Sequence, residues 1–380
     1  MSDKVAILFI IDCILGIGGT EKHLAQLATL LSREGFRCSV VVFDLVANSL
    51  VDTMRAAGVQ VHHVPLGRIY TLSALRRARE LVEIIKRDEI NLVQTFHQKS
   101  DTFGAIVAKV CGVKHIISSK RDVGLFKRSW HVFLNRQLKS LFERTIVVSD
   151  AVAESIMINE GIDRSRIIKI YNGVDTKQFS PPSASEAVEA RARLGLSQSD
   201  FVAGMVAKFS HYKNHRLFFE GAIMAMRQIP SLKIVTVGSG SLLEQYRALY
   251  HSSEELRSRI IFVGAVENVN HYLRAMDVGC LLGNEGFSNA VLEKMATGLP
   301  MIVEGIGGNA EAVINGKNGF VIPPSDADAL CAALVRLHGD TTTRLEMGRW
   351  SRRLVEEKYD LHDMLERHRR LYLSVCRESG

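Results

Sequence analysis

Short apolar runs alternate with longer amphipathic stretches along the first half of the chain. Apolar runs of about four to eight residues are typical of buried strands, and apolar positions that recur every three or four residues are typical of helices. The runs predict strands over 4–11, 38–43, 60–64, 92–95, 115–118 and 144–148. Helices are predicted over 20–33, 72–88, 101–111 and 149–159. This alternation indicates βαβ units with right-handed crossovers and a parallel sheet.

The second half of the chain repeats the alternation. Strands are predicted over 201–206, 232–237, 260–263, 278–282, 300–303 and 319–322, with helices over 215–227, 241–250, 269–276, 288–296 and 326–337. Asn172-Gly173 and Pro181-Pro182 lie between the halves and favour a turn and a break in the sheet pattern. We therefore predict an α/β protein with domains at 1–172 and 183–358. An amphipathic segment in 359–380 is expected to cross back onto the first domain.

Length and composition agree with a two-domain protein. The chain has 380 residues, more than the ~250–300 at which a single core stops growing. Its six cysteines include no C-x-x-C pair, which gives no support to a zinc or redox site and is typical of a reducing cytosol. The apolar run 5–19 is interrupted by Asp12 and is shorter than the ~20 residues of a membrane span. We expect a cytoplasmic protein without a metal or other cofactor.

The net charge of +7 is unevenly distributed. Residues 1–172 hold 24 Lys+Arg against 17 Asp+Glu, whereas 173–380 hold 24 of each. Such an asymmetry suggests that the first half meets an anionic partner, for which a nucleic acid, a phosphorylated acceptor and an acidic membrane surface all qualify. No nucleic-acid module is recognisable, so no nucleic-acid partner is expected. The basic and aromatic stretch 126–142 is interpreted as a core-facing stripe, with a lipid-bound interfacial helix as the alternative.

Glycines follow the first predicted strand at Gly16, Gly18 and Gly19. They allow a ligand to approach the backbone, and the following helix offers free N–H groups to a phosphate. A plain strand-to-helix turn is an equally good interpretation. The dinucleotide pattern G-x-G-x-x-G needs a glycine where Glu21 stands, so a Rossmann-type oxidoreductase or epimerase, with Asp44 as its acidic residue, is kept only as an alternative.

Two carboxylates eight residues apart, Glu285 and Glu293, flank the start of a predicted helix. Glu285 follows a strand and so lies at the carboxyl edge of the sheet, where α/β proteins bind ligands. Ser288 or Asn289 can begin the helix, whose free N–H groups point the same way. Glu293, in the second turn, suits a pair of ribose hydroxyls. The alternative interpretation is a pair of solvent-exposed glutamates that bind no ligand.

Cations follow other predicted strands. Lys208 and Lys213 come directly after the strand 201–206 and can offset diphosphate charge, although a basic surface loop explains them equally well. His97 follows the strand 92–95, where a structural role is the more common one for a lone histidine. Arg121 follows the strand 115–118 and suits a site or a surface ion pair.

Taken together, these segments resemble the family 4 retaining glycosyltransferases, which have the GT-B fold of two facing Rossmann-like domains. The resemblance covers nearly the whole chain, and the order and spacing of its segments are specific. The matching segments are Gly18–Glu21, Asn172–Asp175, Val237–Gly240, Phe262–Gly264, Glu285–Glu293, Met295–Pro300, Gly307–Glu311 and Gly316–Phe320.

The resemblance implies a role for each matching residue. Glu285 would contact the donor sugar, and Glu293 would bind the ribose. The other implied donor contacts are Gly18 and Gly19 at the diphosphate, Lys208 and Lys213 at the phosphates, the Phe287, Ser288 and Asn289 backbone at the phosphate and sugar, and Val266 at the base.

The chain departs from the family pattern at two places. Lys208 stands where arginine is frequent, so bidentate phosphate contact is lost. Many members place a histidine near the reacting sugar after the strand 115–118, where this chain has Ser119-Lys120-Arg121-Asp122. Either Arg121 takes a charge-stabilising role or His97 supplies the imidazole. A catalytically degenerate sugar-nucleotide binder is therefore also an alternative.

The family implies transfer of a sugar, with retention and without a metal, from a nucleotide-sugar donor to an acceptor. A UDP-sugar is the default donor, and a glycan or lipid-linked molecule of bacterial surface polysaccharide or lipopolysaccharide synthesis is the expected acceptor. The charge asymmetry adds peripheral contact with the anionic inner face of the plasma membrane.

Overall fold

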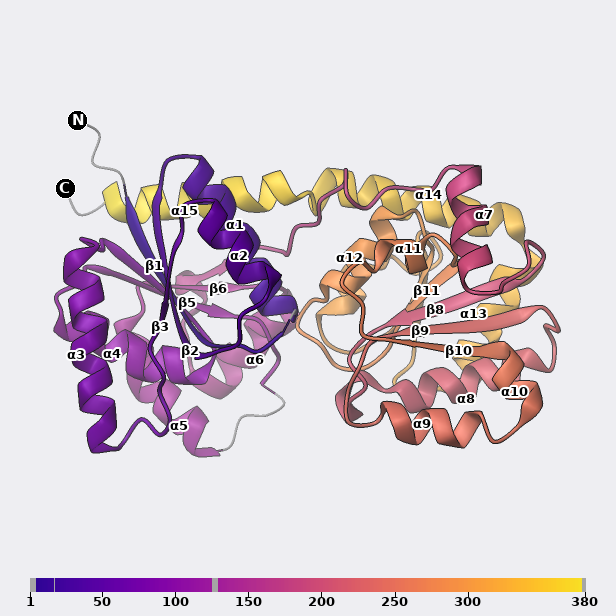
Figure 1. Cartoon of the computed structure of the whole chain (residues 1–380), viewed down its shortest axis with the longest axis horizontal. Helices are drawn as coiled ribbons and strands as arrows, with labels where there is room; N and C mark the ends of the chain where they lie inside the picture. The colour runs from indigo at the N-terminus through magenta and orange to yellow at the C-terminus, as the bar shows by residue number, and fades with distance from the viewer. Residues whose placement is uncertain (1–4, 17, 125–128, 378–380) are drawn as a thin grey trace. The chain divides into compact units, whose positions relative to one another are not determined.

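The computed structural model describes residues 5–16, 18–124 and 129–377. The chain divides into two compact units, coloured in sequence order in Figure 1. Unit 1 comprises Met1–Asn172 and His362–Gly380, and unit 2 comprises Gly173–Leu361. Residues 173–182, which lie between the two predicted domains, are thus counted in unit 2.

Unit 1 contains a parallel sheet of seven strands in the order β3-β2-β1-β4-β5-β6-β7. Its strands are β1 (Ala6–Ile14), β2 (Arg37–Leu45), β3 (Gln60–His63), β4 (Leu92–Phe96), β5 (His115–Lys120), β6 (Arg144–Val147) and β7 (Ile167–Lys169). Its helices are α1 (Gly19–Arg33), α2 (Ser49–Ala56), α3 (Leu72–Arg87), α4 (Ala105–Val110), α5 (Ser129–Leu138), α6 (Asp150–Glu160) and α15 (Leu361–Arg377). Shorter helical turns are the π-helix η1 (Ser100–Gly104) and the 3₁₀ turns η2 (Lys139–Leu141) and η3 (Arg164–Arg166).

Unit 2 contains a parallel sheet of six strands in the order β10-β9-β8-β11-β12-β13. Its strands are β8 (Phe201–Val206), β9 (Leu232–Val237), β10 (Ile260–Gly264), β11 (Val278–Leu281), β12 (Met301–Glu304) and β13 (Gly319–Ile322). Its helices are α7 (Ala184–Arg193), α8 (His215–Met226), α9 (Leu243–Tyr250), α10 (Glu254–Arg259), α11 (Asn270–Leu273), α12 (Asn289–Ala296), α13 (Ala327–Gly339) and α14 (Thr341–Lys358). Two 3₁₀ turns, η4 (His211–Lys213) and η5 (Gly308–Glu311), lie in its loops.

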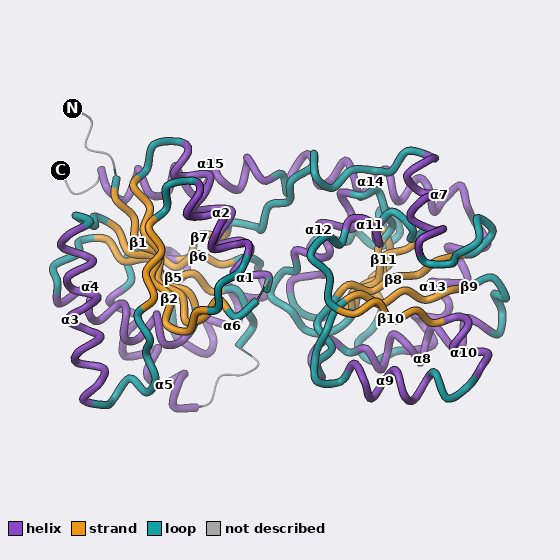
Figure 2. Tube along the Cα trace, in the orientation of Figure 1, coloured by secondary structure: helices purple, strands orange, loops and turns teal. Residues whose placement is uncertain are grey.

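Each sheet is a buried layer within its unit, as the strands and flanking helices of Figure 2 show. Strands covered on both faces are apolar almost throughout, and residues 6–11 of β1 are all fully buried. The predicted α/β class with two Rossmann-like domains is confirmed.

The strand order reverses at one point in each sheet, between β1 and β4 in unit 1 and between β8 and β11 in unit 2. At such a point neighbouring strands send their connections to opposite faces, which leaves room for ligands beyond their carboxyl ends. The loops that follow these four strands therefore define the places to look for a site.

Candidate functional site

In unit 2, the loops after β8 and β11 meet at the reversal point. Lys213, at the end of η4, forms an ion pair with Glu285, and their side chains are only 12% and 14% exposed. Both residues were predicted site residues, although 72 positions separate them in the sequence. The structure thus places a cation and a carboxylate in contact at the carboxyl edge of the sheet.

A third acidic residue, Glu304 at the end of β12, connects the two loops. The Asn214 side chain donates to both Glu304 oxygens at 3.1 Å, and the Gly283 and Ser325 amides donate to the same carboxylate. Glu304 is 1% exposed, so these three donor groups, with four hydrogen bonds, satisfy a charge that has left water. The sequence interpretation did not include Glu304, and its position directly after an apolar strand is the signal that could have revealed it.

Two glycines allow the backbones of this edge to approach closely. Gly283 has φ +97°, and a Cβ there would lie 2.2 Å from the Tyr212 carbonyl oxygen. Gly307 has φ +64°, and its Cβ would lie 2.3 Å from the Glu285 carbonyl oxygen. The Gly308 amide donates to that same carbonyl at 2.8 Å. Any larger side chain would force the Glu285 loop away from its present position.

Two buried acceptors at this edge have no hydrogen-bond partner within the described residues, Glu285 Oε1 and Asn284 Oδ1. Buried polar atoms are nearly always paired, so an unpaired acceptor indicates a missing donor. Sugar hydroxyl groups are donors of the required kind. The Ser288 amide, by contrast, is held by Asn309 Oδ1 at 2.9 Å, which fixes the start of α12.

The other residues predicted to contact the sugar-nucleotide donor differ in their surroundings and exposure. Ser288 is the N-cap of α12, its side chain caps no amide, and Asn289 is the first residue of the helix. Phe287 is 5% exposed and packs on Tyr359, so its side chain belongs to the core. Lys208 is exposed, and Val266 is half-buried after β10.

Glu293 is buried in the second turn of α12, at 7% exposure. Its neighbour Lys294 is fully buried, and burial lowers the pKa of that ammonium to about 8, against the attraction of Glu293. The carboxylate therefore has a cation beside it in a region with little water. Glu293 is the fifth residue of α12 and therefore lies within two helical turns of the loop that carries Glu285.

In unit 1, the glycine loop after β1 leads into α1 with Gly18 as N-cap and no side-chain cap. Gly19 is exposed. A Cβ at Gly18 would lie 2.3 Å from a carboxylate oxygen of Glu21, so this glycine gives room to a charged side chain of the same turn.

His97 follows β4 at the same edge and has φ +73°, which is uncommon for a residue other than glycine. The π-helix η1 begins three residues later. Asp12 of β1 fixes this turn because its carboxylate accepts from the Lys99 and Ser100 amides at 2.8 and 2.7 Å. Burial raises the pKa of Asp12, and nearby His97 acts in the opposite direction. Strained turns and π-helices are frequent at functional sites.

Arg121 follows β5, the strand next to β4. Its Nη2 donates to Asn172 Oδ1 at 2.5 Å. Burial lowers the pKa of the guanidinium to about 9, and Glu21 acts against that shift. The structure brings His97 and Arg121 to the same edge of one sheet, each with a carboxylate near it.

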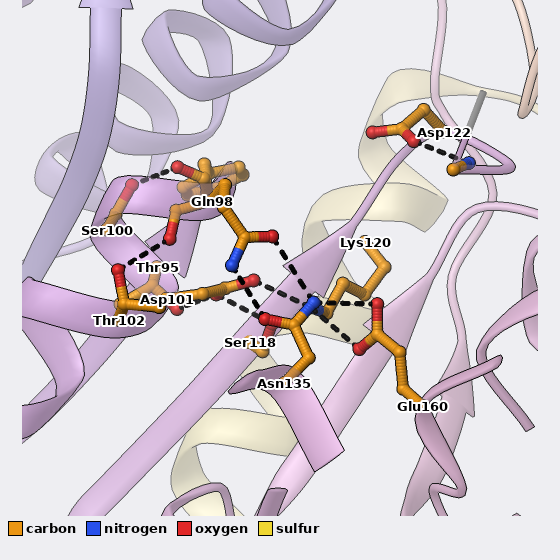
Figure 3. Close-up of polar contacts among 12 residues, drawn as sticks. Thr95, Gln98, Ser100, Asp101, Thr102, Ser118, Lys120, Asp122, Asn135 and Glu160 are labelled. Atoms are coloured by element: carbon orange, nitrogen blue, oxygen red, sulfur yellow. Dashed lines mark hydrogen bonds and ion pairs between the residues drawn. The ribbon is translucent and has the colours of Figure 1, made fainter. Parts of the chain in front are cut away.

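A buried ion network, shown in Figure 3, includes Lys120, the last residue of β5 and the sequence neighbour of Arg121. Lys120 pairs with Asp101 at 2.7 Å and with Glu160 at 3.0 Å, and all three side chains are at most 7% exposed. The two carboxylates raise the pKa of Lys120 despite its burial. Hydroxyl and amide donors complete the network, namely Thr95 and Ser118 to Asp101 and Asn135 to Glu160. Sequence reasoning missed this network because its members come from five different elements.

The interpretation of 126–142 as a core-facing stripe is wrong for two of its aromatic residues. Trp130 and Phe133 are 49% and 64% exposed, whereas Phe142 is buried at 5%. Arg136 and Lys139 donate to carbonyl groups at the end of α6. Phe126, Lys127 and Arg128 lie outside the described residues.

Two further features concern metals and membranes. In the described ranges, no group of three or more His, Cys, Asp or Glu is placed to hold a metal ion. Among the helices that the structure describes, none combines the length and apolar character that crossing a bilayer requires.

Two doubly wound parallel sheets, with charged loops at both reversal points, define a protein of the two-domain Rossmann-like class. The family described as Glycosyltransferase Family 4 matches residues 17–178, and the family described as Glycosyl transferases group 1 matches residues 200–340. The chain belongs to the family 4 glycosyltransferases of GT-B fold, and it is a glycosyltransferase.

The chain is similar to several known proteins along almost its whole length. It is 26% identical over 374 residues to UDP-Gal:alpha-D-GlcNAc-diphosphoundecaprenol alpha-1,3-galactosyltransferase of Escherichia coli, covering 94% of each chain. It is 26% identical to the lipopolysaccharide core biosynthesis mannosyltransferase LpsB of Rhizobium meliloti, covering 77% of this chain and 82% of the relative. Among solved structures, HepE of Anabaena in complex with UDP has a TM-score of 0.85 and 21% identity, covering 97% of this chain and all of that one.

Proposed function

We propose that this glycosyltransferase moves a sugar from a UDP-sugar to a glycan or lipid-linked acceptor, with retention of anomeric configuration. The observation that carries the proposal is the Lys213–Glu285 pair at the β8–β11 reversal, with Glu285 Oε1 buried and unpaired. The E. coli relative is named for a UDP-sugar donor and a diphosphoundecaprenol acceptor, and the R. meliloti relative for lipopolysaccharide core synthesis. These names favour bacterial surface polysaccharide or lipopolysaccharide synthesis as the setting.

The donor is proposed to lie along the carboxyl edge of unit 2. Glu285 accepts hydrogen bonds from hydroxyl groups of the sugar, and Glu293 accepts hydrogen bonds from the ribose hydroxyls. Lys208 and Lys213 neutralise the diphosphate, with help from the positive end of the α12 dipole, where the Ser288 side chain caps no amide. The remaining proposed contacts are Val266 at the base, the Phe287, Ser288 and Asn289 backbone at the phosphate and sugar, and the Gly18 and Gly19 amides at the diphosphate.

The proposed chemistry needs charge stabilisation more than a protein nucleophile. The bond between the sugar and the diphosphate breaks, and negative charge develops on the leaving phosphate, where the lysines and helix amides act. Positive charge develops on the sugar ring near Glu285. The acceptor oxygen forms the new bond to the anomeric carbon on the face that the diphosphate leaves, and its proton passes to the leaving phosphate, which retains the configuration. His97 and Arg121 of unit 1 are the candidates for contact with the reacting sugar, and no metal is required.

The enzyme is proposed to act at the cytoplasmic face of the plasma membrane, because a lipid-linked acceptor would be presented there. The excess of positive charge in residues 1–172 favours contact with an anionic surface.

The direct test is a donor screen with UDP-, GDP- and ADP-sugars, followed by thermal unfolding and by release of the nucleoside diphosphate. We expect stabilisation by UDP-sugars and a fall of about 10²–10³ in turnover for Glu285→Gln, since one lost transition-state contact costs that much. Glu220→Gln is the matched control, because Glu220 is an exposed glutamate of the same unit that pairs with Arg216.

Three results would change the proposal. Full turnover by Glu285→Gln would remove Glu285 from the site. Donor binding without turnover by the wild-type protein, across all acceptors tried, would favour the degenerate binder. Stabilisation by NAD(P) alone would favour the oxidoreductase or epimerase class.

A further inference from the structure

Helix α3 has two faces of different character. Its inward face carries Ala74, Leu81 and Ile85, which are at most 4% exposed and belong to the core of unit 1. Leu72 and Leu75 lie on the other side of the first turns and point away from that core. Residues three and four apart share a helix face, so Arg76 and Arg79 continue the same outward stripe.

The apolar side chains of this outward face are among the most exposed of the described residues. Leu72 is 86% exposed, Tyr70 just before the helix is 76% exposed, and Leu75 is 62% exposed. A single exposed leucine needs no explanation, but three large apolar side chains within six residues form a patch that water solvates poorly.

Three arginines surround these apolar residues. Arg68, Arg76 and Arg79 are exposed, and none of them has a side-chain ion pair or hydrogen bond to another described residue. Arg77, on the flank of the helix, does pair with Glu80 at 2.7 Å. The arginines of this segment that lack a side-chain ion pair among the described residues therefore lie beside its exposed apolar side chains. We refer to Arg68, Tyr70, Leu72, Leu75, Arg76 and Arg79 as the α3 patch.

The neighbouring helix α4 has the same combination on its outer side. Ile106 and Val110, one turn apart, are 43% and 81% exposed, and Lys109 between them is exposed. Helices α3 and α4 pack on each other at the rim of unit 1, as Figure 1 shows. Exposed apolar side chains beside a cation thus occur on both helices of this pair.

We propose that the α3 patch docks unit 1 onto an anionic lipid bilayer, and this inference rests on the proposed function because it brings the enzyme to a lipid-linked acceptor. A helix binds at a bilayer surface when apolar side chains enter the acyl boundary and cations of the same face meet anionic headgroups. Arginines can keep their charge at the headgroups while their stems lie along the apolar region. The charge excess of residues 1–172 adds a longer-range attraction of the same sign.

Vesicle sedimentation tests the proposal with a matched pair of variants of the full-length protein. Leu75→Ser/Arg79→Gln removes one leucine and one arginine of the α3 patch. Leu345→Ser/Arg349→Gln removes the same two residue types, at the same spacing, from the exposed side of α14 in unit 2, where Leu345 is 54% exposed. Both changes lie on the surface, and thermal unfolding checks that both variants fold.

The wild type is expected to sediment with phosphatidylglycerol-containing vesicles and far less with pure phosphatidylcholine. The α3 variant should lose about tenfold in partition coefficient, since each surface arginine contributes about fivefold and the leucine adds to it. The α14 variant should bind as the wild type does. Equal binding by wild type and α3 variant, equal loss in both variants, or equal binding to both lipids would overturn the proposal.

A fluorescence experiment tests insertion separately from charge attraction. The chain has two tryptophans, so Leu72→Trp in a Trp130→Phe/Trp350→Phe background reports from the α3 patch alone. We expect a blue shift with anionic vesicles and quenching by brominated lipid. An unchanged spectrum on sedimented protein would contradict insertion. A dimer in sedimentation velocity that the α3 variant abolishes, without vesicle binding, would instead assign the patch to self-association.

Donor binding distinguishes failure of this inference from failure of the proposed function. The α3 patch contains no proposed donor contact, so UDP should raise the unfolding temperature of the wild type and of both variants equally. Vesicle binding through the patch without any response to sugar nucleotides would overturn the proposed function and leave the docking surface standing.

Discussion

The carboxyl edge of unit 2 and that of unit 1 hold their charged residues in different ways. In unit 2, short loop segments are fixed by close backbone approach at glycines and by Glu304, a carboxylate whose three donor groups come from the neighbouring loops. In unit 1, His97 and Arg121 follow β4 and β5, and these two strands share a buried ion network around Lys120 with η1, α5 and α6. Residues that lie in one short segment form a motif that can be recognised in the sequence. A network of residues from distant segments forms no such motif.

The largest effect should come from breaking the network of unit 1. Lys120→Met leaves Asp101 and Glu160 buried without their cation, which should lower the free energy of unfolding by about 3–5 kcal/mol. Urea unfolding of the full chain measures it. Lys169→Met is the control, since Lys169 pairs with the half-exposed Asp150 and should change stability by about 1 kcal/mol or less.

A restoring variant sharpens the same test. Glu160→Gln added to Lys120→Met removes one of the two orphaned charges, so it should recover part of the lost stability. If Lys120→Met alone is no worse than the Lys169 control, unit 1 does not depend on the network and the contrast with unit 2 disappears.

In unit 2, the two lysines should differ in their effect on donor binding. Lys213 is largely buried and pairs with Glu285, whereas Lys208 is exposed. Lys213→Gln should weaken UDP binding by about tenfold or more, because a charged hydrogen bond in a dry site is worth about 1.5–3 kcal/mol. Lys208→Gln should cost about threefold, because water screens an exposed cation.

Calorimetric titration with UDP measures both constants, and Lys317→Gln provides a control for the loss of a surface charge elsewhere in the unit. Similar constants for the two site variants would mean that burial does not set the contribution of each lysine, and the proposed ranking would be wrong.

The smallest effect concerns a feature that the two units share. Burial lowers the pKa of His215 in unit 2 and of His368 in unit 1 to about 4, with Lys213 and Arg121 acting in the same direction. The unfolded chain takes up these protons near pH 6.5 and the folded chain near pH 4. Stability is therefore complete above about pH 6.5 and falls as the pH drops toward 4.

Replacing either histidine with phenylalanine should remove up to about 2 kcal/mol of the stability lost between pH 7.5 and pH 5. Urea unfolding at the two pH values checks it. Each wild-type ring already lies among aromatic neighbours, Phe209 at 4.0 Å for His215 and Tyr372 at 5.9 Å for His368. An unchanged pH dependence in both variants would show that neither imidazole is protonated on unfolding.

Much of the fold could be predicted from the apolar pattern because parallel strands are buried on both faces and helices on one. The strands from β1 to β6 and from β8 to β13 appear where the runs predict them, within a few residues. The pattern missed β7, which has three residues, and four helices that are short or largely polar, α2, α7, α10 and α14. Elements this short or this polar leave no periodic signal.

In the candidate site, too, the features with a local sequence pattern could be predicted and the contacts between distant segments could not. The sequence by itself determined the glycine loops, the lysines after β8 and the spacing of Glu285 and Glu293, because each follows from a strand end or from one turn of helix. The tertiary structure alone decided that Lys213 meets Glu285, that Glu304 and Asp12 fix the loops, and that Lys120 is buried between two carboxylates. It also decided that Leu72 and Leu75 face outward. Contacts between residues far apart in the chain depend on strand order and burial, which no local pattern encodes.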